Sequence, residues 1–248
     1  MQHRTTYESL NASARIIGGM GATQAFPWFV NLQGCGGVLI APHIVLTAGH
    51  CANEGIRLVG TKVRIGSLWN QKGGEERTVK RVIIHPRFTI QRHEYVTNDL
   101  AILVLNAPST KEPLRIAPTP PVIGETIHYI GFGLTKERPS LPDWSLIPSR
   151  LQQGFGRRIS VTDAIRLFTN PQEKKQIQEP GFIAVESPTQ TACVGDSGGP
   201  AFVIRNGVPY LTGIVSWGPK DCKTVAQDRR VFAISDISMY LPWIQSIH

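Results

Sequence analysis

Short runs of aliphatic and β-branched residues recur along the chain, with turn-forming residues between them. One of them, 79–84, alternates only loosely between apolar and polar positions, as in a half-buried strand. About ten short strands and few helices are typical of a β-sandwich or a β-barrel. The predicted strands are 38–40, 44–46, 63–65, 79–84, 101–105, 127–130, 182–185, 201–204, 211–217 and 231–234.

Turn signals separate these strands and suggest how the chain is divided. Asn206-Gly207, between Ile204 and Tyr210, predicts a tight hairpin. The proline-rich stretch 113–121 is predicted to connect two halves of the chain.

Two segments have a helical pattern. Residues 164–168 follow a cap at Thr162 or Asp163, and Asn170-Pro171 is expected to stop that helix. Residues 240–247 form a second candidate near the end of the chain, with Pro242 in its first turn.

The composition is that of an ordinary globular protein. The chain has 248 residues, 41% of them hydrophobic, which excludes intrinsic disorder as the main state. This length fits one large domain or two small ones. The longest apolar run, Leu100 to Leu105, is far shorter than the roughly 20 residues of a membrane helix, so no membrane span is expected. Residues 1–15 contain no apolar signal segment, so the protein is cytosolic or this chain starts after a removed signal.

Four cysteines stand at positions 35, 51, 193 and 222. No C-x-x-C pair occurs, and the gaps do not resemble those of a zinc site. An even number of cysteines without a metal pattern is compatible with two disulfides and an oxidising compartment. Spacing by itself does not choose among the three possible pairings.

The strongest chemical signal is the segment Gly195-Asp196-Ser197-Gly198-Gly199-Pro200. A serine nucleophile must be exposed on a tight turn whose backbone N–H groups face the substrate oxygen, and flanking glycines permit such a turn. An ordinary glycine-rich loop is the alternative interpretation.

Two further elements strengthen the catalytic interpretation. Segment 46–51 ends a predicted strand and presents His50, and Asp99 directly precedes the predicted strand 101–105. Either residue could be structural if it stood in isolation. The chain order His50, Asp99, Ser197 is one of the known orders of the Ser-His-Asp triad.

Together these motifs resemble the chymotrypsin/trypsin-like serine protease family. The matching motifs are Thr47-Ala48-Gly49-His50-Cys51, Asn98-Asp99-Leu100-Ala101, Gly195-Asp196-Ser197-Gly198-Gly199-Pro200, Ser216-Trp217-Gly218 and Arg15-Ile16-Ile17-Gly18-Gly19. The resemblance implies an all-β fold of two packed six-stranded antiparallel Greek-key barrels. It divides the chain into a propeptide or extension 1–15 and a protease domain 16–248. Within that domain the first barrel spans about 16–120, the second about 121–235, and a short C-terminal helix about 240–247.

The resemblance also implies catalytic roles. His50 is expected to be the general base, Asp99 the carboxylate that orients it, and Ser197 the nucleophile. The N–H groups of Gly195 and Ser197 are expected to form the oxyanion hole. Ser216-Trp217-Gly218 resembles the edge segment that pairs with the substrate backbone.

Disulfide pairing and activation follow from the same resemblance. It selects the pairs Cys35–Cys51 and Cys193–Cys222. Residues 1–15 resemble a propeptide that is cleaved after Arg15, and the new ammonium of Ile16 is expected to pair with Asp196. The expected protein is therefore a secreted zymogen.

Substrate preference depends on the residues that the resemblance places in the specificity pocket. The family position six before the serine is Thr191 here, and the absence of aspartate excludes cleavage after Lys or Arg. Val215 replaces a histidine used by bacterial glutamyl endopeptidases of this fold. Arg230 stands where many members carry glycine, and its guanidinium suits a carboxylate, so we expect preference for Asp or Glu before the scissile bond. Two alternatives remain: Arg229 and Arg230 are a solvated pair, or Arg230 folds away and leaves a small or apolar pocket.

Other classes of function were weighed against proteolysis. A non-catalytic homologue acting as a binding module is the alternative class, and the chain departs from the family at Gly49, Phe132 and 134–190. A net charge of +8 with three basic pairs could attract polyanions, but no nucleic-acid motif accompanies it. The expected partners are protein or peptide substrates, an activating trypsin-like protease and protein inhibitors, with no nucleic acid. We expect a monomer without a cofactor.

A metal site is not expected. The family's calcium loop would lie at 66–76, where Ser67 and Lys72 argue against a cation although Glu75 and Glu76 could serve as ligands.

Overall fold

The structure, a computed structural model of the chain, describes residues 16–53, 57–91, 95–135, 147–219, 222 and 229–247. The predicted propeptide, including Arg15, lies outside the described residues. The helices that are described include none long and apolar enough to cross a bilayer.

Six antiparallel strands close the first barrel in the order β2-β3-β4-β9-β6-β5. They are β2 (Phe29–Asn31), β3 (Gly36–Ala41), β4 (Ile44–Thr47), β5 (Lys62–Ile65), β6 (Glu75–Ile84) and β9 (Ala101–Leu105). A short 3₁₀ turn, η1 (Gly49–Cys51), follows β4, and a separate hairpin pairs β7 (Thr89–Gln91) with β8 (Tyr95–Thr97).

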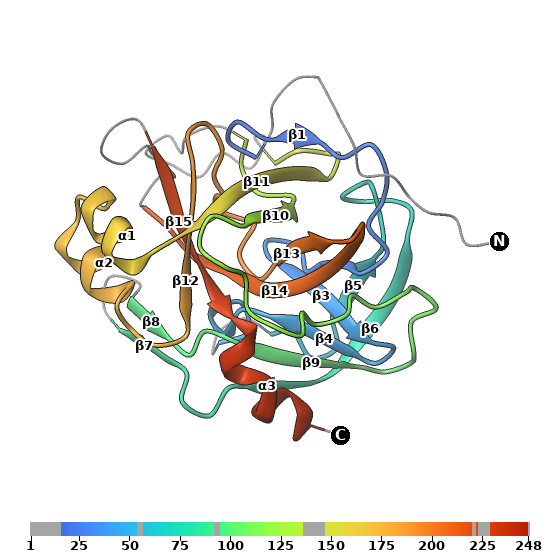
Figure 1. Cartoon of the computed structure of the whole chain (residues 1–248). Coiled ribbons are helices and arrows are strands. Elements are labelled where there is room, and N and C mark those ends of the chain that lie inside the picture. The colour runs from blue at the N-terminus through green and yellow to red at the C-terminus, as the bar shows by residue number, and fades with distance from the viewer. Residues whose placement is uncertain are drawn as a thin grey trace.

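The second barrel has the strand order β11-β10-β13-β14-β15-β12 and closes by pairing β11 with β12. Figure 1 shows it in green, yellow and orange beside the mainly blue first barrel. Its strands are β10 (Thr126–Gly131), β11 (Gln152–Ile159), β12 (Phe182–Ser187), β13 (Pro200–Arg205), β14 (Val208–Trp217) and β15 (Arg230–Asp236). A two-residue strand, β1 (Met20–Gly21), pairs with the outer edge of β11. The two-barrel prediction is therefore confirmed.

Side-chain alternation along β15 decides what faces the interior of the second barrel. Phe232 and Ile234 belong to the apolar cluster inside the barrel, whereas Val231 and Ala233 pack in a separate cluster with helical residues outside it. Because successive side chains of a strand point to opposite faces, Arg230 lies on the same face as Phe232 and Ile234. The predicted role of Arg230 in the specificity pocket depends on this placement.

The first predicted helix forms, but its cap lies elsewhere. The helix α1 (Val161–Leu167) begins after Ser160, whose Oγ accepts a hydrogen bond from the backbone N–H of Asp163. Thr162 and Asp163 are therefore inside the helix, and the prediction of a cap at either was wrong. Ser160, a few residues earlier, caps the free N–H groups of the first helical turn instead.

Asn170-Pro171 begins a second helix instead of only ending the first. Asn170 caps α2 (Pro171–Gln176) by accepting a hydrogen bond from the N–H of Gln172, and Pro171 occupies its first position. Proline is well suited to that position because its missing N–H would have no partner there.

The C-terminal helix begins earlier than predicted. The helix α3 (Ile237–Gln245) is capped by Asp236, which accepts from the N–H of Ser238. Pro242 lies inside the helix, so its placement in the first turn was wrong. The Asn206-Gly207 hairpin between β13 and β14 is confirmed, with φ values of +52° and +73°.

Candidate active site

His50 and Asp99 are brought together by the pairing of β4 with β9. Thr47 lies opposite Ala101 in this register, so the residues just beyond the two strand ends meet. The backbone N–H of His50 donates to Oδ1 of Asp99 at 2.8 Å, and His50 Nδ1 lies 2.8 Å from Oδ2. Two contacts fix the imidazole in one orientation relative to the carboxylate.

Asp99 is fully buried yet ionised. Burial by itself raises the pKa of Asp99, but the charge of His50 and the hydrogen bonds from His50 and Ser216 outweigh it, so the pKa is lowered. The hydroxyl of Ser216 donates to Oδ2 at 2.5 Å, and that of Ser235 donates to the Asp99 carbonyl at 2.8 Å. Sequence reasoning gave Ser216 only a substrate-binding role and missed Ser235, for which no motif existed.

The loop of Ser197 lies against the first barrel. The Ser197 carbonyl accepts a hydrogen bond from the N–H of Gly36 at 2.7 Å, and Cys51 Sγ lies 3.6 Å from the same oxygen. Gly198 has a φ of +80°, and a Cβ there would come within 2.4 Å of the Gly36 carbonyl oxygen. These contacts place Ser197, partly exposed, beside the residue that follows His50.

Asp196 is buried next to Ser197 without a cationic partner among the described residues. Its carboxylate accepts hydrogen bonds from the N–H groups of Gly133 and Cys193 at 2.8 and 2.9 Å. Burial outweighs these two bonds and raises the pKa of Asp196 to about 7. Gly131 and Gly133 are glycines for a steric reason, because a Cβ at either would lie within 2.3 Å of an Asp196 carboxylate oxygen.

Ile16 is completely buried in the interior cluster of the second barrel. Its neighbour Ile17 accepts a hydrogen bond from the N–H of Thr191 at 3.1 Å. The start of the predicted protease domain thus already lies beside the segment that leads to Ser197. In the uncleaved chain the Ile16 nitrogen is a peptide nitrogen and carries no charge.

The two adjacent arginines at the start of β15 have different partners. Arg229 forms an ion pair with Glu186, whose side chain is buried. Arg230, on the inner face, donates from Nη1 to the carbonyl of Cys222 at 2.9 Å. The idea of a solvated arginine pair therefore does not describe these two side chains.

The other predicted pocket residues, Thr191, Trp217 and Gly218, differ in burial and in their contacts. Thr191 is buried, and its Oγ1 donates to the Ala192 carbonyl at 3.1 Å. The ring of Trp217 packs against Phe168 and Phe182, with centroids 5.5 and 5.8 Å away. Gly218, which follows it, is exposed.

Both disulfides have the pairing that the family resemblance implied. Cys35–Cys51 ties the residue after His50 to the chain segment before β3, and Cys193–Cys222 ties the nucleophile loop to the segment before β15. Each bond therefore stabilises a part of the site.

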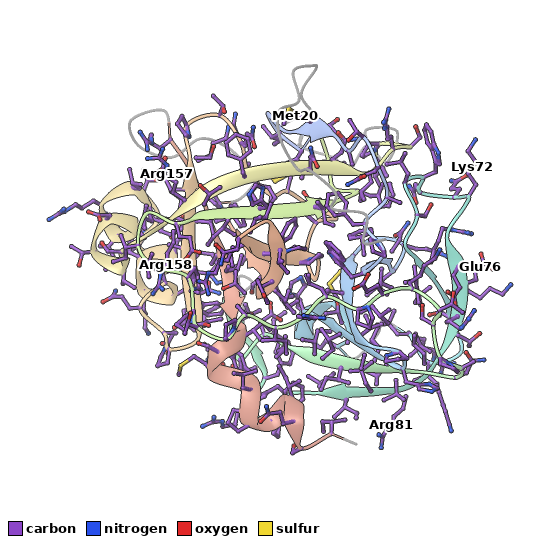
Figure 2. The ribbon with its side chains drawn as sticks, turned by 45° about the vertical axis from the view of Figure 1, so that its right-hand side comes forward. Met20, Lys72, Glu76, Arg81, Arg157 and Arg158 are labelled. Carbon is purple, nitrogen blue, oxygen red and sulfur yellow. A yellow bond between two sulfur atoms is a disulfide. The ribbon has the colours of Figure 1, made fainter. Side chains whose placement is uncertain are left out.

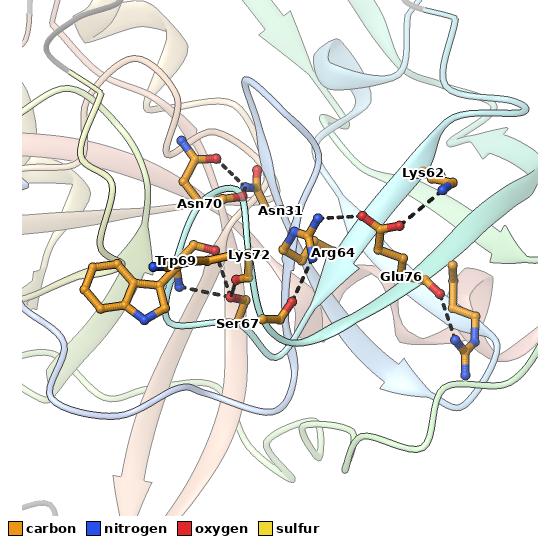
Figure 3. Close-up of polar contacts among 10 residues, drawn as sticks. Asn31, Lys62, Arg64, Ser67, Trp69, Asn70, Lys72 and Glu76 are labelled. Atoms are coloured by element: carbon orange, nitrogen blue, oxygen red, sulfur yellow. Dashed lines mark hydrogen bonds and ion pairs between the residues drawn. The ribbon is translucent and has the colours of Figure 1, made fainter.

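The carboxylates that sequence analysis offered to a cation are held by basic side chains instead. Figure 3 shows Glu76 between Lys62 and Arg64, at 3.3 and 2.5 Å, while Arg64 also donates to the Gly73 carbonyl at 2.8 Å. Glu75 pairs with Arg77 and accepts from Thr110. The guanidinium of Arg64 thus crosslinks the loop 66–76.

Basic residues are spread over distant faces. In Figure 2, Arg157 and Arg158 lie on the side of the molecule that carries α1 and α2, whereas Lys72 and Arg81 lie on the opposite side. Arg158 donates to the Pro121 carbonyl, and Arg205 binds Glu125. This dispersion does not favour a single polyanion site.

Comparison with known proteins assigns the family. A family model described as Trypsin matches residues 16–244. The chain is 31% identical to trypsin iota of Drosophila melanogaster, covering 95% of this chain and 89% of that protein. It is 31% identical to human kallikrein-15, covering 90% and 87%, and 28% identical to mouse vitamin K-dependent protein C, covering 96% of this chain and 53% of that protein. The chain belongs to the trypsin family and is a serine endopeptidase.

Proposed function

We propose that this protein is a secreted endopeptidase, made as a zymogen, that cleaves peptide bonds with His50, Asp99 and Ser197. The observation that carries the proposal is the double contact between His50 and the buried Asp99 beside the loop of Ser197. The substrates are proteins or peptides.

The chemistry follows from the ionisation states of these groups. The Ser197 hydroxyl is a weak nucleophile until His50 accepts its proton during attack on the scissile carbonyl. Asp99, ionised in spite of its burial, holds the imidazole in the required tautomer and stabilises the imidazolium. The N–H groups of Gly195 and Ser197 receive the developing oxyanion, a stabilisation worth about 2.7–4 kcal/mol per donor. His50 then protonates the leaving amine, and water hydrolyses the acyl-enzyme.

Activation requires cleavage after Arg15. The ammonium released on Ile16 pairs with Asp196, whose buried carboxylate has a pKa of about 7 in the uncleaved chain and gains a cationic partner in this way. The pairing orders the loop that carries Gly195. Because Arg15 does not suit a pocket that binds acidic side chains through Arg230, a separate trypsin-like protease performs the cleavage.

Arg230 sets the preference for Asp or Glu before the scissile bond. Its place on the inner face of β15, next to the disulfide-linked Cys222, supports this role. A guanidinium donates two parallel hydrogen bonds to a carboxylate, and a neutral substrate side chain cannot accept both of them. The hydrogen bond to the Cys222 carbonyl supports a competing candidate, in which Arg230 stays folded away and Thr191 forms the base of a small, apolar pocket.

A peptide panel varying only the residue before the scissile bond tests the preference, using protein cleaved after Arg15. The wild type is expected to cleave after Asp and Glu at least 10-fold faster than after Leu, and Arg230→Gly to lose that ratio. Faster cleavage of the Leu, Phe or Val peptides contradicts the acidic preference and supports the small, apolar pocket.

Labelling by an organophosphate tests catalysis itself. Cleaved wild-type protein is expected to incorporate one label per chain, whereas Ser197→Ala incorporates none. Absence of labelling in the cleaved wild type would instead favour a non-catalytic binding module.

A further inference from the structure

The interior of the second barrel contains a polar group that the proposed mechanism does not use. Tyr129, on β10, is completely buried, and its hydroxyl has no hydrogen-bond partner among the described residues. A buried hydroxyl without a partner is costly, and most buried hydroxyls are paired. Phenylalanine would fill the same space without that cost, so the hydroxyl calls for an explanation.

The space for Tyr129 is prepared by its neighbours. Gly154 lies opposite Tyr129 in the β10–β11 register, and a Cβ there would lie 2.9 Å from the Tyr129 hydroxyl. On the other side, the Tyr129 ring packs edge-on against Phe232, with centroids 4.8 Å apart. The ring therefore leans across β11, and its hydroxyl lies over Gly154.

Two sets of contacts connect Tyr129 with the residues of the proposed pocket. Phe155, next to Gly154, donates its N–H to Oε1 of Gln190 at 2.8 Å, and Gln190 directly precedes Thr191. Phe232 shares the inner face of β15 with Arg230. Tyr129 is thus connected, through the Gly154–Phe155 segment and through Phe232, to the two segments that carry the proposed pocket residues.

The charges of Asp196 and Arg230 both influence this hydroxyl. Burial raises the pKa of Tyr129 well above its usual value, the charge of Asp196 raises it further, and that of Arg230 lowers it. The hydroxyl is therefore a neutral O–H group at all relevant pH values. A neutral O–H can donate a hydrogen bond to an anion.

We propose that the Tyr129 hydroxyl is a second hydrogen-bond donor, beside Arg230, for the carboxylate of an acidic side chain bound in the specificity pocket. This inference rests on the proposed acidic preference. A carboxylate offers about four acceptor sites, and a guanidinium fork occupies two of them, so a further donor is useful there. The cost of leaving the hydroxyl without a partner in the empty pocket is then recovered when an acidic substrate binds.

The test compares Tyr129→Phe with the wild type, both cleaved after Arg15 and titrated for active sites. Peptides carry Glu, Gln, Asp, Asn or Leu before the scissile bond. The variant is expected to lower the Glu-to-Gln and Asp-to-Asn ratios of kcat/KM by roughly 10-fold, the usual effect of losing one hydrogen bond to a charged group. Cleavage of the Leu peptide should stay within about 2-fold, and the thermal midpoint should be unchanged or higher, because an unpaired buried hydroxyl is removed.

Tyr240→Phe is the matched control, because Tyr240 also buries a hydroxyl without a partner among the described residues but belongs to α3. It is expected to keep both acidic-to-neutral ratios. One outcome separates the two proposals: the wild type prefers acidic residues, and Arg230→Gly abolishes that preference. If Tyr129→Phe nevertheless leaves the ratios unchanged, this inference fails while the proposed specificity stands. An equal loss on all five peptides also overturns it, since it would indicate a purely structural tyrosine. If the wild type has no acidic preference, the specificity proposal fails and this inference fails with it.

Discussion

The hydroxyl of Ser216 donates a 2.5 Å hydrogen bond to Oδ2 of Asp99, the same oxygen that His50 Nδ1 contacts. Ser216, near the end of β14, is thereby joined to the buried carboxylate. The bond stabilises the ionised form of Asp99 and limits rotation of the carboxylate about its side-chain bond. Ser216 thus combines a predicted role in substrate binding with an observed contact to the carboxylate that orients the imidazole.

Ser216→Ala is expected to lower kcat by roughly 10- to 100-fold, because a hydrogen bond to a buried charge is lost. It should also raise the pKa of Asp99, so activity should fall at a higher pH on acidification than in the wild type. The measurement is the pH profile of kcat on one peptide. Ser235→Ala, which loses only a bond to the Asp99 backbone carbonyl, is the comparison and should leave the profile in place. An unshifted profile in Ser216→Ala contradicts the role given to this hydroxyl.

The uncleaved chain is expected to lose stability as pH rises, because of Asp196. Its pKa is raised from 3.8 to about 7 on folding, so the folded state holds the proton more tightly than the unfolded state. The contribution is complete below pH about 4, declines as pH rises toward about 7 and is absent above that. The shift corresponds to up to about 4 kcal/mol.

Unfolding of uncleaved Ser197→Ala by urea, from pH 4 to 8, measures this effect. Adding Asp196→Asn should remove most of the decline, and the difference between the two proteins isolates Asp196 from the histidines that titrate in the same range. Equal slopes in the two proteins would show that Asp196 is solvated or already paired in the uncleaved chain.

Gly133→Ala is expected to destabilise the protein and to block activation. A Cβ at this position would lie 2.3 Å from Oδ2 of Asp196, a buried carboxylate that the N–H groups of Gly133 and Cys193 hold in place. A loss of about 2 kcal/mol or more in the free energy of unfolding is expected. Gly21→Ala is the matched control, since its nearest neighbour would be the flexible side chain of Arg150 at 3.7 Å. Similar losses in both variants would contradict the steric explanation.

Calcium is expected to have little effect on stability. Arg64 and Lys62 already neutralise Glu76, so the loop 66–76 has an internal cation. The thermal midpoint should change by less than about 1 °C between excess calcium and excess chelator. Arg64→Ala should lower it by roughly 2–4 °C, and the exposed Lys62→Ala by less. An increase of several degrees on adding calcium to the wild type would show that the loop binds the ion.

The apolar pattern predicted the central strands and an all-β fold, because the apolar runs are short, aliphatic and separated by strong turn signals. The two barrels were predicted from the family resemblance. The apolar pattern missed β11, which reads Gln152-Gln153-Gly154-Phe155-Gly156 and has little β-branched character. Two of these residues are glycines because Tyr129 and Val185 fill the space where their side chains would lie. Such a requirement comes from another strand and leaves no local pattern.

The site was predicted from motifs, and the contacts that support it were not. His50, Asp99 and Ser197 were found because each stands in a recognisable short segment. The roles of Ser235, Gly36 and Glu186 depend on partners 136, 161 and 43 positions away, as seen in their contacts with Asp99, Ser197 and Arg229. The helix caps at Ser160 and Asp236 were missed by a few residues, because several neighbouring polar residues could cap equally well.

The hydrogen bond from Gly36 to Ser197 joins the loop of the proposed nucleophile to the opposite barrel. A nascent chain in which only one half has folded therefore lacks the support that positions its serine. Proteolytic capability then emerges only once both halves have docked, whatever the state of the N-terminus. A chain truncated to one barrel is therefore expected to have no peptidase activity, even after a cut at Arg15.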